Sequence, residues 1–227
     1  MSEEEKRIDR LAAFIHRYRF VFLGILVAVV VGLVGVLGYV EIQKSRTEES
    51  VRRIEEVLRK VSQWQQAEAQ EKEKNEKEIL SELDSLLAAF PRSYAAARAL
   101  HVKGEIAFEK KEYSAAAKNW SELADKFPKS HLAPLALLRV AVCKEEQGDI
   151  EGALETLKRT ETRYGAQFPE TPRLLFSIGR LLESKGSSTE AAIFYNRLVD
   201  EYPASSWTKL ARNRLIYFRT TQTNSKS

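Results

Sequence analysis

The residue types that could perform chemistry are few in this chain and widely scattered. The sequence contains three histidines and one cysteine, namely His16, His101, His131 and Cys143. The histidines show no HExxH spacing, and no GxSxG motif, P-loop or glycine-rich phosphate turn follows the N-terminal apolar run. A single cysteine excludes an internal disulfide, a zinc ribbon and a CxxC redox pair.

Acid–base chemistry has equally weak candidates. Glu105, Glu109, Glu145 and Glu146 lie on predicted helices, where solvated charged faces are the far commoner use of such residues. Cys143 follows Ala141 by two positions on a helix predicted to be packed, which favours an inert thiol over a nucleophile. We therefore expect a chain that is not an enzyme, with no catalytic residues, no metal site and no cofactor.

The composition indicates a helical protein instead. The chain has 227 residues, of which 44% are hydrophobic and 30% charged, with only 10 Gly and 6 Pro. This length predicts one soluble unit with an appendage. The net charge of +4 is modest, so nothing predicts a nucleic-acid partner.

The appendage is an apolar run near the N-terminus. Residues 20–40 contain no charge, and at 1.5 Å per residue they extend about 31 Å, close to the thickness of a hydrocarbon core. The run exceeds the signal-peptide core of about 7–15 residues and lacks an A-x-A-like cleavage site, so we interpret it as an uncleaved single-pass transmembrane helix. Gly24, Ala28 and Gly32 recur every fourth residue and predict a smooth stripe for helix packing.

The charges that flank this helix predict its orientation. Five basic residues precede it and four follow within a short distance: Lys6, Arg7, Arg10, Arg17 and Arg19, then Lys44, Arg46, Arg52 and Arg53. The bias is small, and the two arginines closest to the membrane decide it. We expect residues 1–19 to be a cytoplasmic N-terminal stub, with the rest of the chain outside the cytoplasm.

Residues 41–89 are predicted to be a juxtamembrane region of amphipathic helices and a charged spacer. Val51, Ile54, Leu58 and Val61 have helical spacing, which predicts a helix over 47–64 that could also self-associate. The polar stretch 65–78 is either a solvated helix extension or a loose connection. A second apolar rhythm predicts a helix over 76–89, and the two helices would form a degenerate leading pair.

From residue 90 onward the main signal is repetition. An aromatic residue, Pro, any residue and Ser or Thr occur in that order four times, at intervals of 37, 41 and 34 residues, in Phe90–Ser93, Phe127–Ser130, Phe168–Thr171 and Tyr202–Ser205. The proline ends one helix because it lacks an N–H group. The Ser or Thr can cap the next helix by accepting a hydrogen bond from a free backbone N–H.

A second register runs inside these units. Two of them place small, small, aromatic and Pro residues at identical offsets: Gly104, Ala116, Trp120 and Pro128, and Gly179, Ala191, Tyr195 and Pro203. The middle unit keeps the small residues, but its proline comes four residues late, which predicts an extra helical turn or a longer loop. Small residues allow two antiparallel helices to approach closely.

This register resembles the tetratricopeptide repeat (TPR), a helix-turn-helix unit of about 34 residues. The resemblance implies an all-α fold, with the transmembrane helix followed by a TPR-like α-solenoid over residues 90–218 that has three repeats and a capping helix. The breaks within the repeats are predicted at 110–112, 147–149 and 185–187. Residues 219–227 are expected to be a disordered tail.

In TPR proteins the first helix of each repeat lines a concave, partner-binding groove. Carried onto this chain, the groove positions are Arg98, His101, Glu105, Phe108, Leu135, Leu138, Val142, Glu145, Arg173, Phe176, Arg180 and Glu183. An apolar centre ringed by Arg and Glu is typical of a protein-binding surface. The alternative is that the leading helices or neighbouring side chains cover the apolar positions.

A cytoplasmic stub, one membrane helix and an external TPR-like domain together resemble the YfgM-like ancillary SecYEG translocon subunits. The resemblance implies a non-catalytic adaptor in the bacterial inner (plasma) membrane, with a periplasmic C-terminal domain that assists secreted-protein translocation or a periplasmic chaperone. The aromatic-Pro repeats and the charged spacer are more similar to TPR scaffolds for outer-membrane or cell-envelope assembly, which is the alternative. Self-association through the span or the 47–64 helix stays open.

Overall fold

The computed structural model describes residues 3–165 and 167–224, without the side chains of 3–15, 19, 22, 69–70 and 222–224. Within those ranges the chain forms nine α-helices and no strand, so the all-α prediction is confirmed. The helices are α1 (Glu3–Gln66), α2 (Ala69–Ala89), α3 (Tyr94–Glu109), α4 (Tyr113–Lys126), α5 (Leu132–Glu146), α6 (Ile150–Tyr164), α7 (Thr171–Ser184), α8 (Ser188–Glu201) and α9 (Ser206–Asn224).

The chain divides into two compact units, Met1–Glu49 and Ser50–Ser227. Helix α1 contributes to both units, so the predicted helix over 47–64 is not a separate helix but the C-terminal part of α1. The physical reason is that no Gly or Pro occurs between residues 41 and 66 to end the helix. The second unit therefore begins well before the first repeat.

The first unit contains the apolar run. The stretch Leu23–Gln66 includes an 18-residue window with a mean hydropathy of 2.7, none of it buried within the chain, and is long and apolar enough to cross a bilayer. A Cβ atom built on Gly24 or Gly32 would meet nothing within 4 Å. No other side chain of the described residues therefore covers these two glycines. The side chains of Arg19 and Phe22 lie outside the described residues.

The second unit starts with an antiparallel helix pair. Residues 50–66 of α1 pack against α2, where Trp64 Nε1 donates a hydrogen bond to the carbonyl of Lys72 at 3.0 Å and Lys60 pairs with Glu78 at 2.8 Å. The apolar face of this part of α1, including Ile54 and Val57, is buried. Helix α2 begins at Ala69, so most of the charged spacer is helical.

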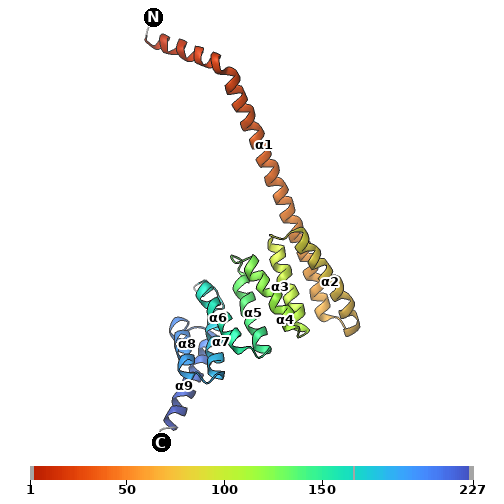
Figure 1. Cartoon of the computed structure of the whole chain (residues 1–227), viewed down its shortest axis with the longest axis vertical. Helices are drawn as coiled ribbons and strands as arrows, with labels where there is room; N and C mark the ends of the chain where they lie inside the picture. Colours follow the sequence, from red (N-terminus) through yellow and green to blue (C-terminus); the bar gives the residue numbers. More distant parts are fainter. Residues whose placement is uncertain (1–2, 166, 225–227) are drawn as a thin grey trace. The chain divides into compact units, whose positions relative to one another are not determined.

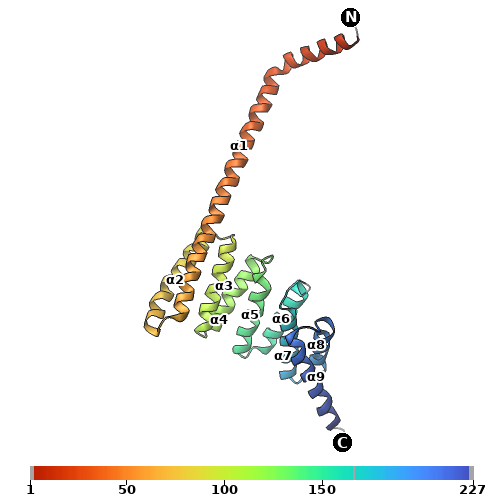
Figure 2. The same cartoon turned by 180° about the vertical axis from the view of Figure 1, so that it is seen from behind.

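Three helix pairs follow, α3–α4, α5–α6 and α7–α8, and α9 lies beside α8 (Figure 1; the reverse view is Figure 2). The pairs break where the sequence predicted. Lys111, Gly148 and Gly186 have φ values of 60°, 78° and 79° at the three turns. Two of these left-handed positions are glycine, which adopts that conformation without the Cβ penalty that Lys111 incurs.

The small-residue register has a steric cause within the pairs. An ideal Cβ on Gly104 would lie 2.3 Å from Trp120 Nε1, and one on Gly179 would lie 2.6 Å from Tyr195 Cε1. Trp120 and Tyr195 are fully buried. Each glycine therefore provides the space into which the aromatic ring of the second helix packs.

The predicted capping residues behave as expected at three of the four turns. The hydroxyl oxygens of Ser93, Ser130 and Ser205 accept hydrogen bonds from the backbone N–H groups of Ala96, Leu132 and Trp207 at 3.1, 3.2 and 3.3 Å. The prediction for Thr171 was wrong. Its hydroxyl is buried and donates to the carbonyls of Phe168 and Gly165 at 2.6 and 2.7 Å, because Thr171 is already the first residue of α7 and Glu170 occupies the cap position.

Helix α9 closes the C-terminal end of the repeats. Its side chains Thr208, Ala211 and Phe218 are buried, and Thr208 donates a hydrogen bond to the carbonyl of Leu198 on α8 at 3.2 Å. The helix continues to Asn224. Residues 219–224 of the predicted disordered tail are therefore helical, and 225–227 lie outside the described residues.

Candidate binding surface

Helices α3, α5, α7 and α9 are connected by ion pairs. Arg180 on α7 binds Glu145 on α5 through two contacts of 2.6 Å each. Arg139 on α5 lies 3.6 Å from Glu105 on α3, and Arg214 Nε on α9 lies 3.0 Å from Glu183 on α7. We call the surface of α3, α5 and α7 that carries the twelve predicted groove residues the first-helix face.

Most of the polar groove residues thus pair with charged side chains of their own or neighbouring helices, whereas no ion pair involves Arg98 among the described residues. Glu183 also accepts a hydrogen bond from the Tyr195 hydroxyl at 3.1 Å, and Arg173 lies 3.6 Å from Glu170. Arg139 and Arg214 were missed by the sequence reasoning. A detectable signal existed, because each glutamate of a pair is followed by an arginine about one repeat later, the interval that separates neighbouring first helices.

The predicted apolar centre of this face is covered. Leu138 is only 1% exposed, and Leu135 is half-buried between two core clusters. The ring of Phe176 packs against Trp207 of α9, with 5.3 Å between the centroids. The space beside Val142 measures only about 20 Å³. The alternative reading, in which neighbours cover these positions, therefore holds for most of the centre.

The first-helix face opens at its N-terminal end. A cleft of about 390 Å³, which we call the aromatic cleft, lies between residues 61–65 of α1 and the α3–α4 pair. Its lining includes Trp64, Gln65, Glu105, Phe108 and Tyr113. The ring of Phe108 packs on those of Tyr113 and Trp120, with centroid distances of 5.4 and 5.8 Å.

Two of the twelve predicted groove residues, Glu105 and Phe108, reach the aromatic cleft. Trp64 and Tyr113 were not predicted, because they come from the leading helix and from the start of a second helix rather than from the first helices. Aromatic side chains carry a large share of the binding energy at protein interfaces. The cleft therefore has the side-chain composition of a binding site.

A buried polar cluster lies beside the aromatic cleft. His101 Nε2 and Arg139 Nε lie 3.7 and 3.6 Å from the same Glu105 oxygen, and that oxygen, Arg139 Nε and His101 Nδ1 have no hydrogen-bond partner among the described residues. Burial, and after it the positive charges of Arg98 and Arg139, lower the pKa of His101 to about 4. His101 is therefore neutral at physiological pH.

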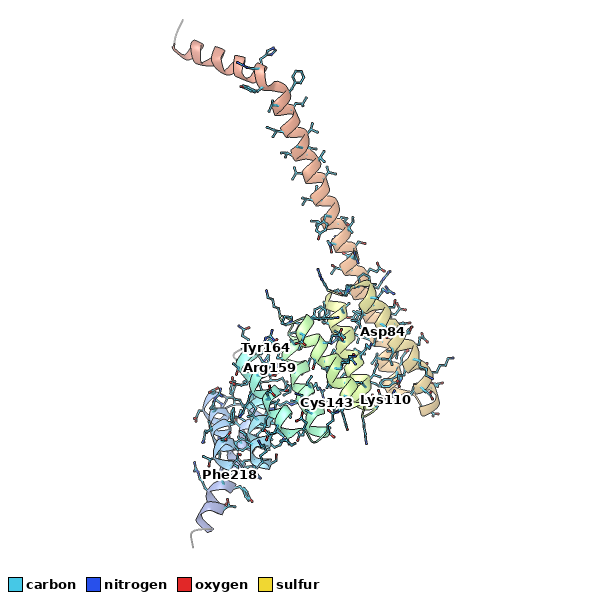
Figure 3. All side chains as sticks on the ribbon, viewed as in Figure 1. Asp84, Lys110, Cys143, Arg159, Tyr164 and Phe218 are labelled. Carbon is cyan, nitrogen blue, oxygen red and sulfur yellow. The ribbon has the colours of Figure 1, made fainter. Side chains whose placement is uncertain are left out.

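The side chain with the greatest intrinsic reactivity, the Cys143 thiol, does not line this cleft. Cys143 is buried on α5, and its burial raises the pKa of the thiol to about 11, so that the thiolate is scarce near neutral pH (Figure 3). In the described part of the chain no three His, Cys, Asp or Glu side chains gather as metal ligands would. What the surface offers is contact area, aromatic rings and paired charges.

The comparison with known families agrees with this geometry. Residues 13–219 match the tetratricopeptide repeat-like domain family, and the chain belongs to that family. A TPR repeat-containing protein of Treponema pallidum (strain Nichols) is 29% identical over 231 residues, covering 95% of this chain and 96% of the relative. The similarity therefore includes the N-terminal apolar helix as well as the repeats.

Solved structures show the same fold. The nearly identical TPR-like repeats of a Podosopora anserina protein, described as a kinesin light chain, superimpose with a TM-score of 0.50 at 13% identity, covering 81% of this chain and 87% of theirs. A substituted variant of those repeats gives a TM-score of 0.51 at the same identity, covering 81% and 86%. At this identity the likeness concerns the fold alone.

Proposed function

We propose that this protein is a membrane-tethered, non-catalytic adaptor that binds other polypeptides through the aromatic cleft. TPR folds serve as protein interaction scaffolds. The observation that carries the proposal is the opening of about 390 Å³ lined by Trp64, Phe108 and Tyr113, at the N-terminal end of a face whose apolar centre is mostly covered. An apolar side chain of the client fits between these rings, and Glu105 beside them favours a polar or basic neighbour.

The proposed location is the bacterial inner (plasma) membrane, with residues 1–19 in the cytoplasm and the repeat unit in the periplasm. Support comes from the apolar run of α1, from the arginines that precede it, and from a bacterial relative of almost equal length. A membrane tether raises the effective concentration of the repeats near their client, so that weak contacts in the cleft are sufficient. The stripe of Gly24, Ala28 and Gly32 would face a neighbouring membrane helix.

Within that membrane we propose a place beside the SecYEG translocon, where the adaptor assists secreted proteins or a periplasmic chaperone. The support is the resemblance of the architecture to the ancillary translocon subunits. The alternative of an envelope-assembly scaffold expects a helix over residues 47–64 that self-associates. Ile54, Val57 and Val61 of that segment are buried within the chain's own second unit, so these side chains are not available to a second copy.

Site-specific photocrosslinking in intact cells tests both the adaptor and its place. A photoreactive residue at Gln65, which lines the aromatic cleft, is compared with one at Lys118, an exposed residue of α4. Adducts with Sec subunits or their clients at Gln65 alone support the proposal. Adducts with outer-membrane assembly proteins favour the alternative function, and equal adducts at both positions contradict a binding role for the cleft.

The topology has its own test. In spheroplasts, protease added from outside is expected to digest the chain beyond Lys44 while leaving the N-terminal stub intact. A repeat unit that resists digestion until the cells are lysed would reverse the proposed orientation. Detection with tags at each terminus distinguishes the two results.

A further inference from the structure

A second cleft in the described part of the chain shares no residue with the aromatic cleft. It has a volume of about 470 Å³ and lies between the α4–α5 turn and the α6–α7 connection. We call it the loop cleft. Tyr164, which lines it, is the last residue of α6, on the same helix as Arg159 (Figure 3).

The loop cleft exists because the middle repeat departs from the repeat pattern. Helix α6 has 15 residues where α4 and α8 have 14, and the connection that follows α6 is longer than those after α4 and α8. This connection supplies Gln167, Phe168 and Pro169 as one wall of the cleft, and Pro128 to His131 supply the opposite wall.

Hydrogen bonds hold the two walls in place. The Tyr164 hydroxyl donates to the carbonyl of Pro128 at 3.1 Å and thereby joins the walls. The Thr171 hydroxyl donates to the carbonyls of Phe168 and Gly165 at 2.6 and 2.7 Å. His131 stacks on Tyr94, with 6.3 Å between the ring centroids. A site that is already ordered loses little entropy when a ligand binds.

The loop cleft carries uncompensated positive charge. Lys129 lies on one wall and Arg163 on the other, and neither has an ion-pair partner among the described residues. None of the described lining residues is acidic, and the neighbouring Glu170 pairs with Arg173 at 3.6 Å. Arg139, Arg173 and Arg180 of the first-helix face are instead paired with glutamates. Charge left unpaired in a cleft attracts anionic ligands.

The floor of the cleft is apolar and ring-shaped side chains dominate it. Pro134 and Phe168 are buried there, and the guanidinium of Arg163 lies 5.1 Å from the centre of the Tyr164 ring. A phospholipid headgroup would use the two cations but leave this floor without a partner. An acidic peptide uses both, because its carboxylates and its aliphatic or proline side chains alternate along one extended strand.

We propose that the loop cleft is a second protein-binding site, which takes an extended acidic segment of a partner polypeptide. The partner's carboxylates bind Lys129 and Arg163, and its apolar side chains pack on Tyr164 and Phe168. The volume of about 470 Å³ suits a segment of a few residues. The chain would then hold two different ligands at once.

The test is a selection of short random peptides on the purified full-length chain in detergent. The chain is compared with the Lys129→Glu/Arg163→Glu variant and with a Lys118→Glu/Lys209→Glu control, which has the same change in charge at exposed sites outside the cleft. Peptides rich in Asp and Glu together with Leu or Pro are expected from the natural chain and from the control. Selection without acidic enrichment overturns the proposal.

Affinity measurements with the best selected peptide test whether it binds in the loop cleft. We expect the Lys129→Glu/Arg163→Glu variant to bind about tenfold more weakly or worse, with the control within about twofold and with weaker binding at high salt. An equal loss of affinity in both variants overturns the proposal. The proposal is also overturned if binding to anionic phosphatidylglycerol vesicles depends on Lys129 and Arg163 but peptide binding does not. Matching circular dichroism melts confirm that both variants fold, and the aromatic cleft is unaltered in both.

Discussion

Glu145 on α5 and Arg180 on α7 face each other in a fork-to-fork ion pair, with both N–O contacts at 2.6 Å. Two parallel bonds fix the relative orientation of the two helices as well as their distance. The pair therefore couples the second repeat to the third at a junction that the packing of small and aromatic residues within each repeat does not reach.

A double-mutant cycle on Glu145→Gln and Arg180→Gln should give a coupling free energy of about 1 kcal/mol, since the geometry is two-pronged while both side chains remain partly exposed. Urea unfolding of the full-length chain followed by circular dichroism measures it. The exposed pair Glu122 and Lys126, one turn apart on α4, is the control and should couple by less than about 0.5 kcal/mol. Equal couplings would show that the repeats are joined by apolar packing alone.

Gly104→Ala should destabilise the chain by about 1–3 kcal/mol, although Gly to Ala usually stabilises a helix. The new methyl group would overlap the indole of Trp120, which is fully buried and cannot move away. The free energy of unfolding measures the effect. Combination with Trp120→Phe should recover part of the loss, because the smaller ring frees the space that the methyl group needs. An unchanged or higher stability of Gly104→Ala would refute the close-approach explanation.

The free energy of unfolding should decrease as the pH is lowered, and His101 is one cause. Its folded pKa of about 4 lies below the ordinary value of 6.5, so the unfolded chain binds more protons in this window. The contribution is fully present above pH 6.5 and decreases as the pH falls towards 4, by roughly 3 kcal/mol at most. His101→Gln should therefore lose less stability on acidification than the natural chain.

The matched control for this prediction is His131→Gln, which removes an exposed histidine at the loop edge. Lys77 lowers the pKa of Glu73, and Lys60 lowers that of Glu78. The contribution of these two carboxylates to the stability of the folded chain therefore also decreases in acid. They are present in every variant and cancel in the comparison. Parallel pH profiles for the natural chain and His101→Gln would count against a neutral, buried imidazole.

Cys143 should react with iodoacetamide only when the chain unfolds. The side chain is fully buried, and its raised pKa of about 11 leaves little thiolate at about pH 8. Mass spectrometry of the chain with and without urea measures the labelled fraction. Rapid labelling of the folded chain would mean that α5 opens far more readily than its packing implies. Cysteine labelling reports on this residue alone, because Cys143 is the only cysteine in the sequence.

The sequence predicted the repeat fold because its register depends on local sterics. Proline, glycine and the pairing of a small residue with a ring act within one helix pair, as Gly104 with Trp120 shows. The role of Thr171 was not predictable in the same way, because it depends on how the connection before α7 folds. The start of the second unit inside α1 is also a packing property, and no residue type marks it.

The binding surface was harder to predict than the fold. Offsets within the repeat correctly placed residues on the first helices, but exposure at those positions depends on neighbours from elsewhere in the chain. Trp207 of α9 covers Phe176, whereas Trp64 of α1 extends the open cleft beside Phe108. Both tryptophans lie outside the three repeats, where the repeat register carries no information.

Helix α9 also affects the order in which the repeats can be unfolded and degraded. Phe218 near its end packs on Tyr195, with 6.1 Å between the rings, while Arg214 binds Glu183. A protease that engages the C-terminus must pull this helix away before it meets any repeat. Once α9 is gone, Phe176 has lost its contact with Trp207 and the α7–α8 pair has lost the helix that covered it. Degradation is therefore expected to begin at the third repeat and to proceed through the repeats towards the N-terminal apolar helix.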